Sequence, residues 1–243
     1  MKLFKALPLS LIILLSSFAF ASCGSGEDGI EFADDNFKKG VMTALSKTLG
    51  GVTYEEAESL TSLTLSSTLT TIEDIVHFPN LTRLTLTKQE TNNIDFTPLK
   101  DLVKLTTLDL TSNNLSDISF LSEMTALRDL RLSFNKIADI RPLQNLKSLT
   151  ILYLDNNLVD SVEPLAGLTN LSQLRMQYNQ IEDISPMSTL ARCLTELNLQ
   201  QNKIKDISVL AEFRFLATLD IGANPDIVDY SPLDVLTDTR IRR

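Results

Sequence analysis

A period of 22 residues constrains the fold of this chain more than any other feature. The unit that begins at Leu127 reads LRDLRLSFNKIADIRPLQNLKS, and the next reads LTILYLDNNLVDSVEPLAGLTN. Similar or looser units begin at Leu60, Leu81, Leu105, Leu127, Leu149, Leu171, Leu194 and Leu216. These eight units cover residues 60–236. A repeat of this length predicts a stack of similar coils that share one hydrophobic core.

Each unit contains a strand pattern followed by a different, shorter pattern. In LxLxx, alternate residues point to opposite sides, so Leu130 and Leu132 are expected to face the inside of the coil. The I-x-D-I-x-P-L stretch from Ile137 to Leu143 contains Pro142 and is too short for an α-helix of about 10 residues, which predicts a 3₁₀ or irregular return arm. The fold class is therefore an α/β solenoid, with a parallel sheet on its concave side and 3₁₀ or irregular structure on its convex side.

Two polar columns recur in register with the leucines. A buried asparagine amide offers two donors and an acceptor to backbone groups where the chain turns inward, so we expect the asparagines to be structural. The aspartates are expected to cap the return arms, and their recurrence once per coil argues against a calcium site. The asparagines are Asn113, Asn135, Asn157, Asn179, Asn202 and Asn224, and the aspartates are Asp117, Asp139, Asp183 and Asp206.

The repeat and the residues before it resemble a known family. The consensus LxxLxLxxNxIxDIxPLxxLxx is that of a leucine-rich repeat, and its subtype resembles the bacterial internalins. FADDNFKKGVMTALSKTLGGVTYEEAESLTSL also resembles the internalin cap, which implies a helical N-terminal cap over residues 31–59. The residues after the last unit, 237–243, are expected to form a short C-terminal tail.

Local signals predict two helices within the cap. Asp34 or Asp35 can begin a helix that carries Phe37, Val41, Leu45 and Leu49 at helical spacing, and Gly50-Gly51 closes it. A second, short helix is expected after the capping box Thr53-Tyr54-Glu55-Glu56.

The first 22 residues predict export. Two lysines precede an apolar run that is short and interrupted by Pro8, which favours a signal peptide over the alternative, an N-terminal membrane helix. Phe20-Ala21-Ser22-Cys23 resembles a bacterial lipoprotein signal, which implies lipid attachment at Cys23 and a flexible linker over residues 23–30. Cleavage nearby, with Cys23 incidental, is the alternative. The resemblance implies an exported protein anchored at the outer membrane or cell surface, in preference to a free periplasmic or secreted one.

Composition excludes several classes of function. The net charge is −9, which disfavours binding to nucleic acid because phosphate backbones repel such a chain. One histidine, His77, and two distant cysteines leave no material for a metal site or a Cys/His catalytic pair. Nucleophile, phosphate-loop and metal motifs are absent from the sequence, so we expect no enzyme activity and no cofactor.

The concave face offers a candidate binding surface. Tyr153 stands between Arg131 and Arg175 on adjacent strands, with Phe134 and Tyr178 beside them. Acidic residues are expected around this patch at Asp109, Asp129 and Asp155. Arginine and tyrosine are enriched where proteins bind one another, although cross-strand packing and cation–π pairing on a solvated face would explain the same residues.

These observations favour a binding module that acts as a monomer and takes a protein ligand on its concave face. The alternative function is a structural or adhesive envelope component that binds wall or surface polysaccharide, because exposed aromatic rings can stack on sugars. Comparing capture by envelope glycans with capture by protein extracts would distinguish them.

Overall fold

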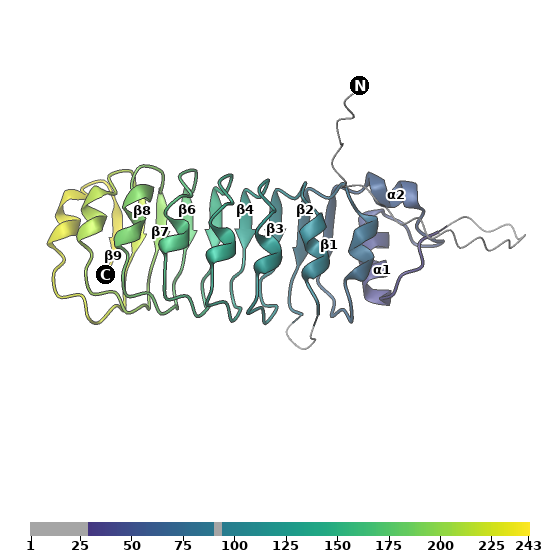
Figure 1. Ribbon diagram of the computed structural model, residues 1–243, viewed down its shortest axis with the longest axis horizontal. Coiled ribbons are helices and arrows are strands. Elements are labelled where there is room, and N and C mark those ends of the chain that lie inside the picture. Colours follow the sequence, from purple (N-terminus) through teal and green to yellow (C-terminus); the bar gives the residue numbers. More distant parts are fainter. Residues whose placement is uncertain (1–28, 90–93) are drawn as a thin grey trace, which may run out of the picture.

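The computed structural model describes residues 29–89 and 94–243, which wind into one row of stacked coils (Figure 1). The described residues form a sheet of nine parallel strands that follow one another in chain order. The strands are β1 (Ser62–Leu65), β2 (Arg83–Leu86), β3 (Thr107–Asp109), β4 (Asp129–Arg131), β5 (Ile151–Tyr153), β6 (Gln173–Arg175), β7 (Glu196–Asn198), β8 (Thr218–Asp220) and β9 (Arg240–Arg242). We call the outer surface of this sheet the concave face.

A short 3₁₀ helix returns the chain after each strand from β1 to β8. Pro142 suits the beginning of η4 because its missing N–H would have no partner there. Asp139 accepts a hydrogen bond of 2.9 Å from the N–H of Arg141, the first residue of η4, which confirms the expected capping role. The arms are η1 (Glu73–His77), η2 (Thr97–Asp101), η3 (Ser119–Leu121), η4 (Arg141–Leu143), η5 (Glu163–Leu165), η6 (Ser185–Leu190), η7 (Ser208–Glu212) and η8 (Ser231–Val235).

The core lies between the sheet and the return arms and continues from coil to coil. Leu130 and Leu132 enter it from the strand side, and both are fully buried. Ile137, Leu143 and Leu146 enter it from the arm side and are also fully buried. Leu130 lies in register with the central leucines of β3 and β5, so each coil covers the apolar side chains of its neighbours. The predicted solenoid and the division of each unit into strand and return arm are confirmed.

The asparagine column forms a buried hydrogen-bond ladder along the solenoid. Asn157 donates to the carbonyl oxygens of Leu132 and Leu154 at 2.9 and 3.0 Å, and its Oδ1 accepts from the N–H of Ile137 at 3.0 Å. Its side chain therefore ties its own coil to the preceding one. Gln89, at the position that asparagine takes in the later coils, was not predicted as part of this column and begins the ladder: its Oε1 accepts from the N–H of Leu69 at 2.7 Å.

Two α-helices cover the first coil at the end of the stack opposite β9 (Figure 1). They are α1 (Asp35–Ala44) and α2 (Tyr54–Ser59). Asp34 is the N-cap of α1 and accepts from the N–H of Phe37 at 2.7 Å. It also accepts from the N–H and hydroxyl of Thr70 at 2.6 and 2.7 Å, which joins the cap to the first repeat. Burial alone would raise the pKa of Asp34, but the hydrogen bonds from Thr70 and Phe37 outweigh it and lower that pKa.

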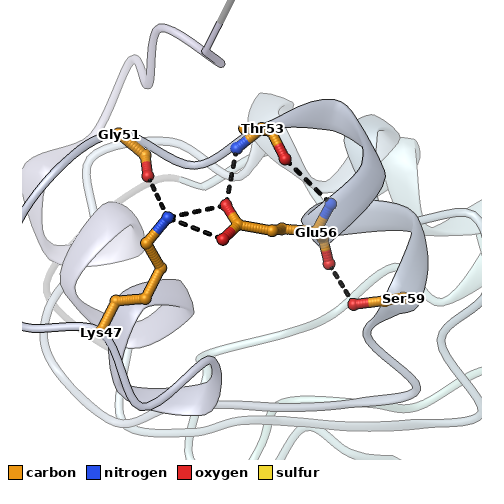
Figure 2. A network of polar contacts seen from close by, with 5 residues as sticks. All are labelled: Lys47, Gly51, Thr53, Glu56 and Ser59. Carbon is orange, nitrogen blue, oxygen red and sulfur yellow. Dashed lines mark hydrogen bonds and ion pairs between the residues drawn. The ribbon is translucent and has the colours of Figure 1, made fainter. Parts of the chain in front are cut away.

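The capping box of α2 is present and fixes the segment between the two helices (Figure 2). Glu56 accepts from the N–H of Thr53 at 2.9 Å, and its own N–H donates to the Thr53 hydroxyl at 3.2 Å. Lys47 contacts both carboxylate oxygens of Glu56 at 2.7 and 2.8 Å and donates to the carbonyl oxygen of Gly51. The hydrogen bonds from Lys47 and Thr53 lower the pKa of the Glu56 carboxyl.

Leu49 does not lie on the helix, contrary to expectation. Helix α1 ends at Ala44, and the chain turns at Ser46, whose φ of 56° lies in the left-handed region. Leu49 follows this turn and is 84% exposed. Hydrophobic spacing alone could not locate this early end, since it depends on the conformation of Ser46.

The C-terminal residues also differ from expectation. Residues 240–242, assigned from the sequence to a tail, form the ninth strand, β9. Ile241 takes the register position of Leu219 in β8 and packs partly buried against the core. Arginine on both sides of Ile241 conceals the apolar alternation, because a single apolar residue is a weak strand signal.

Candidate binding surface

Two columns of side chains face outward from the strands on the concave face. In one column, Asp109, Arg131, Tyr153 and Arg175 occupy successive register positions on β3 to β6. In the other, each residue lies two positions earlier in its strand, as Asp129 does in β4 and Glu196 in β7. The structure therefore brings four of the six predicted site residues into one line across the sheet.

Tyr153 lies between two guanidinium groups. The Cζ atom of Arg131 is 5.3 Å from the centre of its ring, and that of Arg175 is 4.5 Å away. The Tyr153 hydroxyl also donates to Gln173 at 3.0 Å. This arrangement, which we call the Arg–Tyr–Arg stack, is held by cation–π attraction across three neighbouring strands.

A carboxylate orients each arginine of the stack. Asp129 accepts two hydrogen bonds of 3.1 Å from Nε and an Nη atom of Arg131. Glu196 lies 2.7 Å from an Nη atom of Arg175 and 2.9 Å from its Nε. The hydrogen bonds to Asp129, with Asp109 and Tyr153 nearby, raise the pKa of Arg131. Because a guanidinium has five N–H donors, both arginines keep donors free for a ligand.

Sequence reasoning missed Glu196 and placed Asp155 wrongly. Glu196 could have been found, since a residue two positions before an outward-facing residue of a strand faces the same way. Asp155 does not flank the patch: it is buried and accepts a hydrogen bond of 2.8 Å from the Ser133 hydroxyl. Asp155 lies two residues beyond the end of β5, so strand alternation no longer decides which way its side chain points.

Phe134 and Tyr178 lie at the rim where the chain leaves the sheet. Both have left-handed backbone conformations, with φ of 57° and 58°. This conformation continues the backbone hydrogen bonds between neighbouring coils beyond the strands. The N–H of Phe134 donates to the carbonyl oxygen of Asp155 at 2.9 Å, and the N–H of Tyr178 donates to that of Gln200 at 3.0 Å. Phe134 is 55% exposed and Tyr178 is 48% exposed. A left-handed conformation costs a bulky side chain about 1–2 kcal/mol, and neither ring recovers this cost by full burial.

Two hollows adjoin this patch. One, with a volume of about 280 Å³, lies beside Phe134 and is lined by Asn114, Lys136 and Asn156. The other, of about 300 Å³, extends from Arg175 to Arg242 along the concave face. A larger hollow, of about 790 Å³, lies on the opposite side between η4 and η5, where the exposed pair Asp139–Arg141 already satisfies its own charges.

Other predicted features lie elsewhere. His77 contacts the Tyr54 ring edge-on at a centroid distance of 5.7 Å, in the first coil and away from the Arg–Tyr–Arg stack. In the part of the chain that the structure describes, no three His, Cys, Asp or Glu side chains are placed to hold a metal ion. None of the helices within that part has the length and apolar character needed to span a membrane. The expected signal peptide and Cys23 lie outside the described residues.

Comparisons with known proteins agree with this architecture. The family model described as Leucine Rich repeats (2 copies) matches residues 103–145, 125–167 and 147–192, and a Leucine Rich repeat model matches residues 191–211. The fold and these matches define the chain as a leucine-rich repeat protein. No curated protein matches the sequence.

Solved structures specify the family more closely. Internalin C2 of Listeria monocytogenes is 36% identical, with a TM-score of 0.79 over 87% of this chain and 93% of that one. The internalin inlF of the same organism is 34% identical, with a TM-score of 0.73 over 86% of this chain and 68% of that one. The chain belongs to the internalin family. A leucine-rich repeat protein of Leptospira interrogans shares the fold at 23% identity, with a TM-score of 0.69 over 82% of this chain and 53% of that one.

Proposed function

We propose that this internalin-family protein binds a protein partner through the Arg–Tyr–Arg stack and its aromatic rim. The proposed contact residues are Asp109, Arg131, Phe134, Tyr153, Arg175 and Tyr178. The observation that carries the proposal is the pair of exposed rings, Phe134 and Tyr178, held in left-handed conformations beside the stack. Cross-strand packing accounts for the arginines and Tyr153, but it does not account for these two rings.

The stack is suited to binding because its side chains are ordered before a partner arrives. Asp129 and Glu196 hold the arginines in place, and Tyr153 fills the space between them. Immobilising a long side chain on binding costs about 0.5–1.5 kcal/mol, and a pre-ordered patch avoids much of this cost. Flat aromatic area with directed donors is the chemistry of protein hot spots.

Affinity capture from protein extracts, followed by mass spectrometry, tests the proposal with the full chain as bait. The double variant Phe134→Asn/Tyr178→Asn is expected to lose the partner and keep its fold. Phe215→Asn is the matched control, because Phe215 is also an exposed phenylalanine, at 64%. It lies between η7 and β8 on the segment that enters a strand, whereas Phe134 and Tyr178 lie where the chain leaves one. Capture that the double variant retains in full would rule out this surface.

A polysaccharide ligand is the second candidate function. The hollow beside Phe134 places an aromatic ring next to the amides of Asn114 and Asn156, and this combination suits stacking and hydrogen bonding to a sugar. Capture by envelope glycans, with loss in Phe134→Asn alone, would favour this candidate over a protein partner.

The proposal includes export and lipid attachment at Cys23, with the repeats at the outer membrane or cell surface. It is supported by the charged and apolar composition of residues 1–22 and by the Phe20-Ala21-Ser22-Cys23 sequence. Cys23→Ser is expected to release the protein from the membrane fraction, whereas Cys193→Ser, which removes the other thiol, leaves it there. A Cys23→Ser protein that remains with the membrane would contradict the lipid anchor.

A further inference from the structure

The concave groove beyond the stack carries more positive than negative side chains. It lies over β6 to β9 and has a volume of about 300 Å³. Three arginines and two acids line it: Arg175, Arg240, Arg242, Glu196 and Asp220. Arg175 also belongs to the Arg–Tyr–Arg stack, so the groove continues the proposed binding patch.

The acids do not satisfy all the arginines. Glu196 is paired with Arg175 at 2.7 Å. Asp220 accepts from the N–H of Gly222 at 3.1 Å and lies 3.9 Å from the guanidinium of Arg242. Among the described residues, no carboxylate lies within 4.0 Å of the Arg240 guanidinium. The groove therefore presents one unpaired and one loosely paired guanidinium.

The spacing of Arg240 and Arg242 favours a ligand whose charged groups have the same spacing. Arg240 and Arg242 flank Ile241 in β9, and Ile241 packs against the core, so alternation directs both arginines to the concave face. Residues two apart in a strand are separated by about 6.6 Å. Alternate side chains of an extended ligand have the same separation. Guanidinium groups match carboxylates through paired N–H donors.

We propose that the groove binds an extended acidic segment of the protein partner, with carboxylates on alternate residues facing Arg240 and Arg242. This inference rests on the proposed function and identifies the chemistry of the partner at the C-terminal half of the concave face. The net charge of −9 does not prevent it, because charges farther than about 8 Å are largely screened at physiological salt.

Peptide binding to the full chain at physiological salt tests the inference without the natural partner. The probe is a capped peptide of three Glu-Ser repeats, and the comparison peptides carry Gln-Ser or Lys-Ser repeats. Only the Glu-Ser peptide is expected to bind. The variant Arg240→Gln/Arg242→Gln is expected to weaken its binding at least tenfold, since each arginine contributes charged hydrogen bonds.

Arg243→Gln is the matched control. It removes one positive charge at the next position, where the double variant removes two, and the guanidinium of Arg243 lies 5.3 Å over the ring of Tyr230 and does not line the groove. It is expected to change binding less than threefold. Equal weakening by Arg243→Gln, or binding that Arg240→Gln/Arg242→Gln leaves intact, would overturn the inference. So would failure of the Glu-Ser peptide to bind the unmodified chain.

The two proposals fail in different ways. If the Glu-Ser peptide does not bind but Phe134→Asn/Tyr178→Asn abolishes partner capture, the acidic-segment inference is wrong and the concave binding surface stands. If the peptide binds as expected but the aromatic variant keeps its partner, the groove is supported and the patch around Phe134 is not.

Discussion

Replacing Phe134 with asparagine separates the contribution of its ring to folding from its contribution to binding. Full burial of a phenylalanine side chain contributes up to about 3 kcal/mol, and Phe134 is 55% exposed, so loss of its ring costs about 1 kcal/mol. Asparagine tolerates the left-handed conformation, as at Asn156 with a φ of 55°, and relieves about 1 kcal/mol. The two effects oppose each other, and the free energy of unfolding is expected to change by less than about 1 kcal/mol.

Thermal melting followed by circular dichroism, combined with quantitative partner capture, measures both effects. For a chain of this size the melting midpoint of Phe134→Asn should stay within about 4 °C of the unmodified protein, while capture is lost. Phe213→Ala is the contrasting control, because Phe213 is fully buried and its truncation costs about 3–5 kcal/mol. A fall of more than about 8 °C for Phe134→Asn would refute the reasoning, since it would mean that the ring supports the fold.

Three further predictions concern the ladder, the cap and the convex ion pair. Asn157→Ala leaves buried backbone groups of two coils without their bonds and should cost at least about 2 kcal/mol in chemical denaturation. Because the pKa of Asp34 is lowered, its carboxylate stabilises the fold above the ordinary pKa of 3.8, and this stabilisation is lost as the pH falls through the lowered pKa. Asp34→Asn should therefore be less stable than the unmodified chain near neutral pH, and the difference in stability should shrink in acid. A variant equally destabilised at both pH values would exclude that role. Arg141→Gln should raise the pKa of Asp139 from about 2 towards 3.8 in an NMR titration, because the Arg141 side chain donates the hydrogen bonds that lower it.

The sequence predicted those parts of the molecule that depend on periodicity. Leu130, Asn157 and Asp139 each occupy a position that recurs in every coil or nearly so, and repetition separates their structural roles from chance. The Arg–Tyr–Arg stack was also predictable, because parallel pairing in register brings residues 22 positions apart side by side.

Features that occur once were harder to predict. The end of α1 depends on the backbone at Ser46, and the partner of Arg175 depends on the position of Glu196 on the next strand. The left-handed conformation of Phe134 was hard to predict for a different reason. It recurs in the turns after most strands, but among the described residues the eight non-glycine residues that adopt it there include lysine, serine and alanine as well as aromatic residues, so no residue type indicates it.

The asparagine ladder has a consequence for how such a chain can evolve. Asn157 bonds to its own coil and to the one before it, so the ladder makes no contact that depends on the total number of coils. Duplication or deletion of one 22-residue unit by recombination would join two equivalent coils and lengthen or shorten the sheet by about 4.8 Å. The length of the concave face available to a ligand can thus change by one coil at a time during evolution, while each remaining hydrogen bond of the ladder keeps an equivalent partner.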